Sequence, residues 1–113
     1  MKGPIFITGG SRCGTELARS ILNRHPLVHI ALETHYFDDP RPRLADPARP
    51  SADEAEALLD HFMRVSGHGY GLRTGDVGDP MREIFRKRWA ARGREADALF
   101  TVFCANEAES KGK

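Results

Sequence analysis

The chain has 113 residues, of which 40% are hydrophobic and 29% are charged, a composition typical of one small globular domain rather than of a disordered segment. Its formal net charge is +1, so no global field points to nucleic acid or to an anionic membrane, and any anion binding must come from a local site. No apolar run reaches the ~18 residues of a membrane-spanning helix, and residues 1–7 lack the apolar stretch of a signal peptide. We therefore expect a cytoplasmic protein with no membrane span and no nucleic-acid partner, whose cysteines, Cys13 and Cys104, are reduced thiols.

The first elements predicted along the chain are a strand, a glycine turn and a helix. Residues 5–8 form a short apolar, partly β-branched run that ends at the glycines of 9–10, which predicts a buried strand stopping at a tight turn. Apolar residues at helical spacing then predict a helix over 15–22, which ends before Pro26. The apolar face of this helix consists of Leu17, Ile21 and Leu22.

A second strand and a proline-rich loop are predicted next. The apolar run 28–32 predicts a strand, and residues 33–35 follow at its carboxyl end. Residues 38–50 contain four prolines, which exclude regular structure and predict a loop. Two strands do not make a stable parallel sheet alone. We therefore expect an α/β fold, a P-loop-type parallel sheet with flanking helices, of which the chain holds only the N-terminal part.

The second half of the chain, residues 51–109, is predicted to be helical. Ser51 followed three residues later by Glu54 has the pattern of a capping box and predicts a helix through about residue 65. The glycines of 67–78 predict a flexible connection.

Two further helices are predicted after this connection. Pro80 suits the first turn of a helix that continues to about residue 92, and Gly93 ends it. Residues 96–109 predict a last helix, although the β-branched content of 100–102 is also compatible with a strand there.

Residues 9–16, named the phosphate loop here, have the arrangement of an anion-binding turn. A glycine-bearing turn between a strand and a helix directs unpaired backbone N–H groups and the positive end of the helix dipole at an anion. Gly9 and Gly14 are separated by four residues, as in a nucleotide P-loop, but Thr and Glu follow where that loop has Lys and Ser or Thr. The cation inside the loop is Arg12. The loop is therefore expected to hold a phosphate without a metal ion rather than a magnesium-bound nucleoside triphosphate.

This order of strand, Gly-x-x-Arg-x-Gly-Thr and helix resembles the 5′-phosphosulfate loop of sulfotransferases that use 3′-phosphoadenosine 5′-phosphosulfate (PAPS) as donor. Arg12, Gly14 and Thr15 match the pattern of that family. Cys13 replaces a common serine with a group of similar size. Glu16 replaces a common second hydroxyl residue and is the clearest departure, because a carboxylate beside a bound phosphate repels it.

Two later segments extend the resemblance to about residues 4–37. Asn-Arg-His-Pro at 23–26 is similar to the helix exit of the family, and Glu-Thr-His-Tyr-Phe at 33–37 resembles the segment after the second strand in carbohydrate-type sulfotransferases. In the family, later elements bind the 3′-phosphate of the donor and form much of the acceptor pocket. We therefore expect residues 1–113 to be the N-terminal part of one sulfotransferase-like domain, with a phosphate loop (9–16), a proline-rich loop (38–50) and a helical segment (51–109).

The resemblance implies an enzyme that transfers a sulfuryl group from PAPS to a hydroxyl or amine of a small-molecule, carbohydrate or lipid acceptor, although the fragment alone is open to being inactive. Glu33 would be the general base, and Arg12 would stabilise the departing phosphate. His35 would orient Glu33 or contact the acceptor. No metal is expected, and the residues that would bind the donor are Ser11, Arg12, Cys13, Gly14 and Thr15.

Two alternatives stay open at this point. Cys13 and Arg19 are separated by five residues and Ser20 follows, which is the spacing of tyrosine-phosphatase-like loops that attack phosphorus with a cysteine thiolate. The chain is also compatible with a truncated P-loop domain without catalytic activity. The sequence leaves the acceptor and the oligomeric state undetermined.

Overall fold

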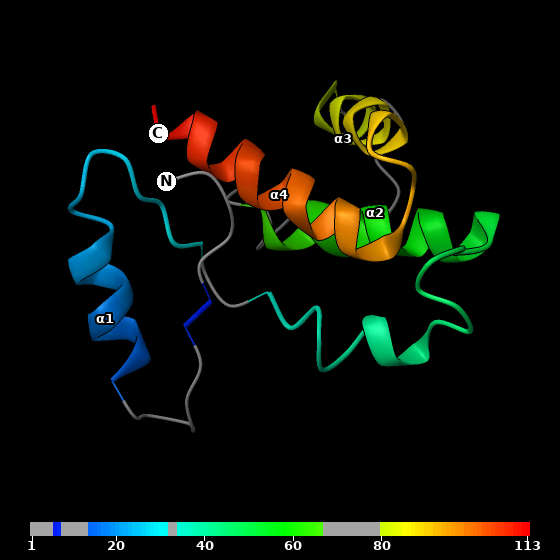
Figure 1. Cartoon of the computed structure of the whole chain (residues 1–113), viewed down its shortest axis with the longest axis horizontal. Coiled ribbons are helices and arrows are strands. Elements are labelled where there is room, and N and C mark those ends of the chain that lie inside the picture. The colour runs from blue at the N-terminus through cyan, green and yellow to red at the C-terminus, as the bar shows by residue number, and fades with distance from the viewer. Residues whose placement is uncertain (1–5, 8–13, 32–33, 67–79) are drawn as a thin grey trace.

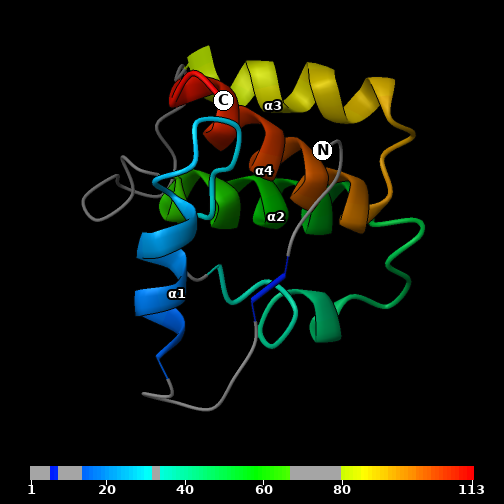
Figure 2. The same ribbon diagram turned by 60° about the vertical axis from the view of Figure 1, so that its left-hand side comes forward.

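The computed structural model of the chain describes residues 6–7, 14–31, 34–66 and 80–113. Helices α2, α3 and α4 pack against one another, whereas α1 stands to one side of them (Figures 1 and 2). In chain order the elements are α1 (Thr15–Leu22), a short 3₁₀ turn η1 (Arg41–Arg43), α2 (Ala52–Val65), α3 (Pro80–Ala91) and α4 (Ala96–Ser110).

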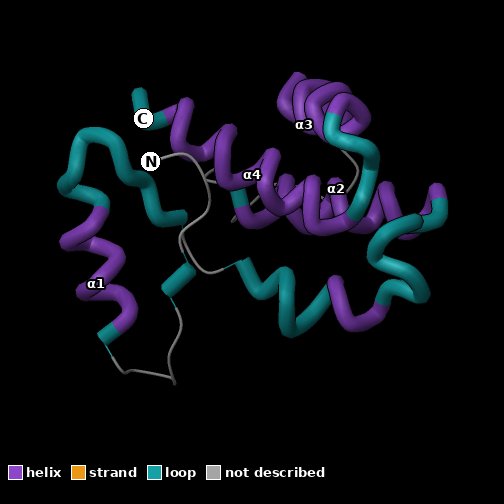
Figure 3. Tube along the Cα trace, viewed as in Figure 1, coloured by secondary structure: helices purple, strands orange, loops and turns teal. Residues whose placement is uncertain are grey.

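The predicted parallel sheet, and with it the α/β fold class, is wrong for the part of the chain that the structure describes, where no residue lies in a strand (Figure 3). Residues 6–7 and 28–31, from the two predicted strands, are extended or irregular chain, and the remainder of each run lies outside the described residues. A strand needs a neighbouring strand for its backbone groups. At Ile30 the side chain of Asn23 pairs with the backbone groups instead of a neighbouring strand. Its Oδ1 accepts from the N–H of Ile30 at 2.6 Å, and its Nδ2 donates to the carbonyl of Ile30 at 3.0 Å.

The helix predictions are confirmed. α1 has the predicted bounds, and residues 100–102 lie inside α4 rather than in a strand. α2 begins with the predicted capping box, in which Ser51 Oγ accepts from the N–H of Glu54 at 3.2 Å and Glu54 Oε1 accepts from the N–H of Ser51 at 2.9 Å. The proline-rich loop contains η1 as its only helical turn, and the predicted glycine connection 67–78 lies outside the described residues.

The hydrophobic core lies between α2, α3 and α4 and also receives Tyr36 from the segment that precedes the proline-rich loop. Apolar residues at helical spacing place one face of each helix in this core. The side chains with at most 3% exposure are Tyr36, Leu58, Leu59, Phe62, Phe85, Trp89, Ala96, Leu99, Val102 and Phe103.

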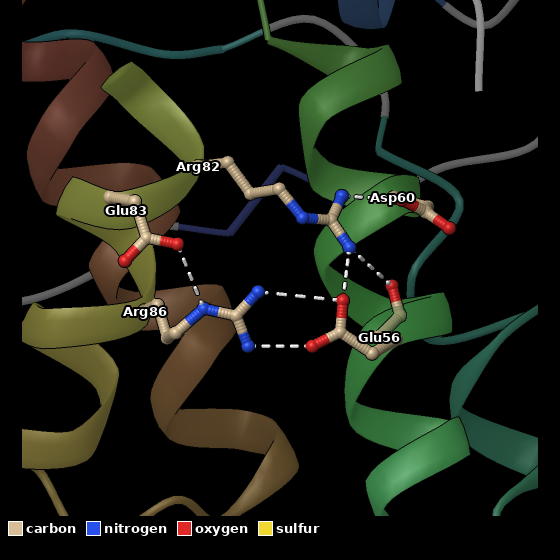
Figure 4. A network of polar contacts seen from close by, with 5 residues as sticks. All are labelled: Glu56, Asp60, Arg82, Glu83 and Arg86. Carbon is tan, nitrogen blue, oxygen red and sulfur yellow. Dashed lines mark hydrogen bonds and ion pairs between the residues drawn. The ribbon is translucent and has the colours of Figure 1, made fainter. Parts of the chain in front are cut away.

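A network of charged side chains joins α2 to α3 beside this core (Figure 4). The guanidinium of Arg82 donates to the carboxylates of Glu56 and Asp60, and that of Arg86 donates to Glu56 and, at 3.2 Å, to Glu83. Hydrogen bonds from Arg86 and then from Arg82 lower the pKa of Glu56 to about 2. The carboxylate of Glu56 is therefore the acceptor that both arginines share.

The segment between α1 and residue 31 is attached to the C-terminal end of α4. Lys113 Nζ donates to the carbonyl of Asn23 at 2.7 Å and also to the carbonyl of Val28. His29 Nε2 lies 3.8 Å from Glu107 Oε2, with both side chains largely buried. Burial lowers the pKa of His29, an effect that the nearby Glu107 carboxylate partly opposes. These contacts matter because α1 itself contributes no buried residue.

We predict that Glu56→Gln lowers the free energy of unfolding by about 1 kcal/mol at neutral pH, since partly exposed ion pairs contribute modestly. The pKa of Glu56 is lower in the folded state, so its stabilisation is present above about pH 4.5 and is lost as the pH falls toward 2. Urea unfolding of both proteins should show a stability difference that shrinks between these pH values. Glu83→Gln is the matched control and should have a smaller effect, because Glu83 pairs with Arg86 on its own helix. A difference independent of pH would contradict the prediction.

A second prediction concerns Asn23, whose substitution by Ala removes both hydrogen bonds to Ile30 and leaves a part-buried amide without its acceptor. The expected loss of stability is about 1–2 kcal/mol. Amide hydrogen exchange by NMR should show faster exchange at Ile30, whereas Arg24→Ala, at the exposed neighbouring position, should leave that amide protected. Unchanged exchange at Ile30 in the Asn23 variant would show that the two hydrogen bonds from the Asn23 side chain do not hold this segment.

Candidate functional site

Gly14 forms the turn that opens α1. It is the N-cap residue, with φ 92° and ψ 12°, a left-handed conformation that favours glycine. A Cβ at this position would meet no atom within 4 Å, so backbone conformation rather than lack of space selects glycine here. The carbonyl of Gly14 accepts the first bond of the helix, from the N–H of Ala18 at 3.0 Å.

The first turn of α1 has the features of an anion-binding helix start. Because its N-cap residue is glycine, no side chain at the cap accepts a hydrogen bond from the first backbone N–H groups of the helix. Such N–H groups have no partner within a helix, and the helix dipole adds partial positive charge at the same end. Phosphates and sulfates bind at helix ends of this kind. The start of α1 is therefore compatible with the phosphate-loop prediction, while residues 9–13 of that loop lie outside the described part of the chain.

Glu16, the residue that departs from the sequence pattern, is paired within the helix. Arg19 Nε and Nη2 donate to the same carboxylate oxygen, Glu16 Oε2, at 3.2 and 3.0 Å. Glu16 is 71% exposed and Arg19 is 26% exposed, so the cation is the more buried partner. The negative charge at the start of α1 thus has a cation one turn further along the helix.

The segment after residue 33 is held against α2 by a buried histidine. His61 Nε2 donates to the carbonyl of Thr34 at 2.7 Å, and burial lowers the pKa of His61 and favours its neutral form. Thr34 Oγ1 also accepts from the N–H of Tyr36 at 3.4 Å. The carbonyl of Thr34, the residue that follows the predicted base in sequence, is therefore hydrogen-bonded to α2.

Tyr36, two residues after Thr34, is bonded to α4. Its hydroxyl donates to Asp97 Oδ1 at 2.7 Å, and the guanidinium of Arg41 donates to both oxygens of Asp97, at 2.8 and 3.1 Å. Burial and the bond to Asp97 raise the pKa of Tyr36, so the hydroxyl keeps its proton at all ordinary pH values. Arg41 in turn lowers the pKa of Asp97 and holds it as a carboxylate.

His35 lies at the surface between these two anchors. Its backbone is left-handed, with φ 54°, and its side chain is 54% exposed. His35 Nδ1 lies 3.3 Å from Asp38 Oδ2. The imidazole is therefore accessible from solvent.

Of the predicted site residues, the structure describes three. Gly14 and Thr15 lie together at the start of α1, and His35 lies on the segment anchored by α2 and α4. The other predicted residues lie outside the described part of the chain; they are Ser11, Arg12, Cys13 and Glu33.

Three residues in this region make contacts that the sequence analysis did not predict. Arg19 carried a signal, because it stands three residues after Glu16 and so faces it on a helix. His61 lies within the apolar face of α2 and is 8% exposed, which marks a titratable group in a buried position. Asp97 gave no signal, since its partners Tyr36 and Arg41 lie 61 and 56 residues away in the chain.

The structure describes residues 6–7, 14–31, 34–66 and 80–113, which show neither a metal cluster nor a membrane-spanning helix. Within these ranges no group of three or more His, Cys, Asp or Glu side chains is placed to hold a metal ion. None of the helices described there has the length and apolar character needed to cross a bilayer.

Comparison with known proteins identifies the family. The chain matches the family described as "Sulfotransferase family" over residues 4–107, which is most of its length. The match includes α1, the segment that contains Thr34 and Tyr36, α2, α3 and all but the last three residues of α4. Comparisons with curated proteins and with solved structures gave no match. Since the family match extends over far more than half of the sequence, the chain belongs to the sulfotransferase family.

Proposed function

We propose that the chain binds the 5′-phosphosulfate end of PAPS at the phosphate loop (9–16) and the start of α1, and that it serves sulfuryl transfer to a hydroxyl or amine. The observation that carries the proposal is the helix start itself, opened by a left-handed Gly14 and not capped by a side chain. It lies where the resemblance expects the donor phosphate. Membership of the sulfotransferase family supports the same chemistry.

In the proposed reaction the acceptor oxygen or nitrogen attacks the sulfur of PAPS in line with the bond to the 5′-phosphate. A new S–O or S–N bond forms, the S–O bond to the phosphate breaks, and its electron pair goes to the phosphate oxygen. Glu33 takes the acceptor proton as general base. Arg12 and the N–H groups of residues 13–15 stabilise the charge that develops on the phosphate.

The anchored segment supports the role proposed for Glu33. A general base must stay within hydrogen-bond reach of the proton that it removes. Thr34, the next residue, is held by His61 through its carbonyl, and Tyr36 is held by Asp97 through its hydroxyl. His35 is accessible, and we propose that it orients Glu33 or contacts the acceptor, which would be a small molecule, a carbohydrate or a lipid.

The phosphatase-like alternative is disfavoured by the position of Arg19. In a Cys-x5-Arg loop the arginine wraps the phosphate together with the residues that precede it. Here Arg19 lies within α1, and its guanidinium pairs with Glu16 in the first turn. The non-catalytic alternative is separated by assay, since a chain of that kind would release no 3′-phosphoadenosine 5′-phosphate from PAPS.

The donor site is tested with Arg12→Ala. Calorimetric titration with 3′-phosphoadenosine 5′-phosphate should show at least tenfold weaker binding, because a charge-assisted contact to the phosphate is lost. Arg24→Ala, which removes the same charge from an exposed position just after α1, should bind like the parent chain. Equal binding by the parent and the Arg12 variant would remove the loop assignment.

The base is tested with Glu33→Gln. We expect donor binding to stay within about twofold of the parent, while turnover with a panel of carbohydrate, lipid and small-molecule acceptors falls by roughly 100-fold or more. Release of 3′-phosphoadenosine 5′-phosphate measures turnover, and calorimetry measures binding. A Gln variant with full turnover would refute the role of Glu33, and a parent chain that binds donor without turnover would favour the non-catalytic reading.

A further inference from the structure

The segment that follows α1 lies beside the C-terminal end of α4 and meets it at a buried histidine (Figures 1 and 2). The side chains of His29 and Glu107 are 10% and 13% exposed, and His29 Nε2 lies 3.8 Å from Glu107 Oε2. This separation is longer than a hydrogen bond. Nε2 is buried and has no hydrogen-bond partner in the part of the chain that the structure describes. His29 is therefore a buried titratable group whose contact with α4 changes when it takes up a proton.

Charges from α1, from α4 and from the residues after α4 act on His29. The carboxylate of Glu107 favours the protonated ring, whereas Lys113, Lys111 and Arg19 disfavour it. Burial also disfavours the protonated ring, because a charged group loses its hydration in a protein interior, and this effect is the largest. Together these effects lower the pKa of His29 from its ordinary value. The neutral ring therefore suits this position better than the charged ring.

The attachment to which His29 belongs also includes a fixed positive charge. Lys113 Nζ donates to the carbonyls of Asn23 and Val28, and so ties the segment to the end of the chain after α4. The two hydrogen bonds between Asn23 and Ile30 lie within the segment and do not connect it to α4. A proton on His29 therefore adds a second positive charge to the contacts that hold residues 23–29 against the end of α4.

We infer that His29 makes this attachment sensitive to pH. Residues 23–29 are docked on the end of α4 while the ring is neutral, and they are released when the ring is protonated, because the charged ring regains its hydration and leaves the lysines behind. Since α1 buries none of its residues, release of the segment also frees α1 from the packed helices. The response needs no bound nucleotide and goes beyond the proposed function.

The docked segment is expected to be more stable at neutral pH than in mild acid. A histidine in the released segment has an ordinary pKa of about 6.5, and the docked His29 has a lower one. The docked state is therefore fully favoured above about pH 6.5 and loses stability as the pH falls below that value. Between about pH 7.5 and 5.5, the ratio of released to docked segment should rise by up to about tenfold.

The test is amide hydrogen exchange by NMR on the full chain over this pH range, with each rate compared with the intrinsic rate at the same pH. Protection of the Val28 and Ile30 amides should fall by roughly three- to tenfold on acidification. The nuclear Overhauser effect between the His29 ring and the Glu107 side chain should weaken in parallel. The ring carbons of His29 should titrate with a pKa below about 6.5.

Two histidine variants assign the response. His29→Gln is neutral at every pH, so protection of Val28 and Ile30 should change by less than about twofold over the same range. His25→Gln is the matched control, because His25 is an exposed histidine on the same segment, and this variant should respond like the parent chain. Circular dichroism checks that both variants retain their helices.

The inference is overturned if the parent chain keeps the same protection at both pH values, or if His29→Gln loses protection as the parent does. A response that disappears in His25→Gln instead would assign the pH sensitivity to His25 and would also overturn it. If His29→Gln does not fold, the ring titration of the parent chain decides, since a pKa at or above about 6.5 contradicts the inference. None of these measurements uses a nucleotide, so their failure leaves the proposed donor site untouched.

Discussion

Burial of Tyr36 in the core of α2, α3 and α4 connects the two halves of the chain. Its ring has no exposed surface, stacks on Phe100 at a centroid distance of 5.5 Å and lies 5.3 Å from Phe62. Its hydroxyl is bonded to Asp97 in the first turn of α4. An aromatic ring contributes much buried area, and its hydroxyl adds direction. Tyr36 is therefore fixed relative to the packed helices.

The start of α1 is held in a different way. Its apolar face is exposed, with Leu17 at 66% and Ile21 at 58% exposure. Its position therefore depends on the segment that follows it, where Asn23 clamps Ile30 and Lys113 holds two backbone carbonyls. The segment that follows α1 is thus held near the packed helices by polar contacts to its backbone rather than by burial of apolar surface.

The net charge of the chain is only +1, and several of its carboxylates have an arginine beside them. Glu16 is matched by Arg19 on the same helix, and Asp97 is matched by Arg41 beside Tyr36. Away from the site, the network of Glu56 with Arg82 and Arg86 does the same between α2 and α3 (Figure 4). Anion binding at α1 then depends on the helix start and on Arg12 and not on a general excess of positive charge.

Local signals in the sequence determined the helices, the capping box of α2, the glycine turn at Gly14 and the resemblance to the family to which the chain belongs. Each of these depends on residues within a few positions of one another, so a linear pattern contains it. The ion pair of Glu16 and Arg19 could have been predicted in the same way, because residues three apart on a helix lie on the same face.

Tertiary structure alone decided the rest. An apolar, β-branched run predicts a strand only if another strand lies beside it, and at Ile30 the backbone is paired with the side chain of Asn23 instead. The anchors of the segment after residue 33 join Thr34 to His61 across 27 residues and Tyr36 to Asp97 across 61. Such contacts form when packed helices bring distant residues together, and no local spacing in the sequence encodes them.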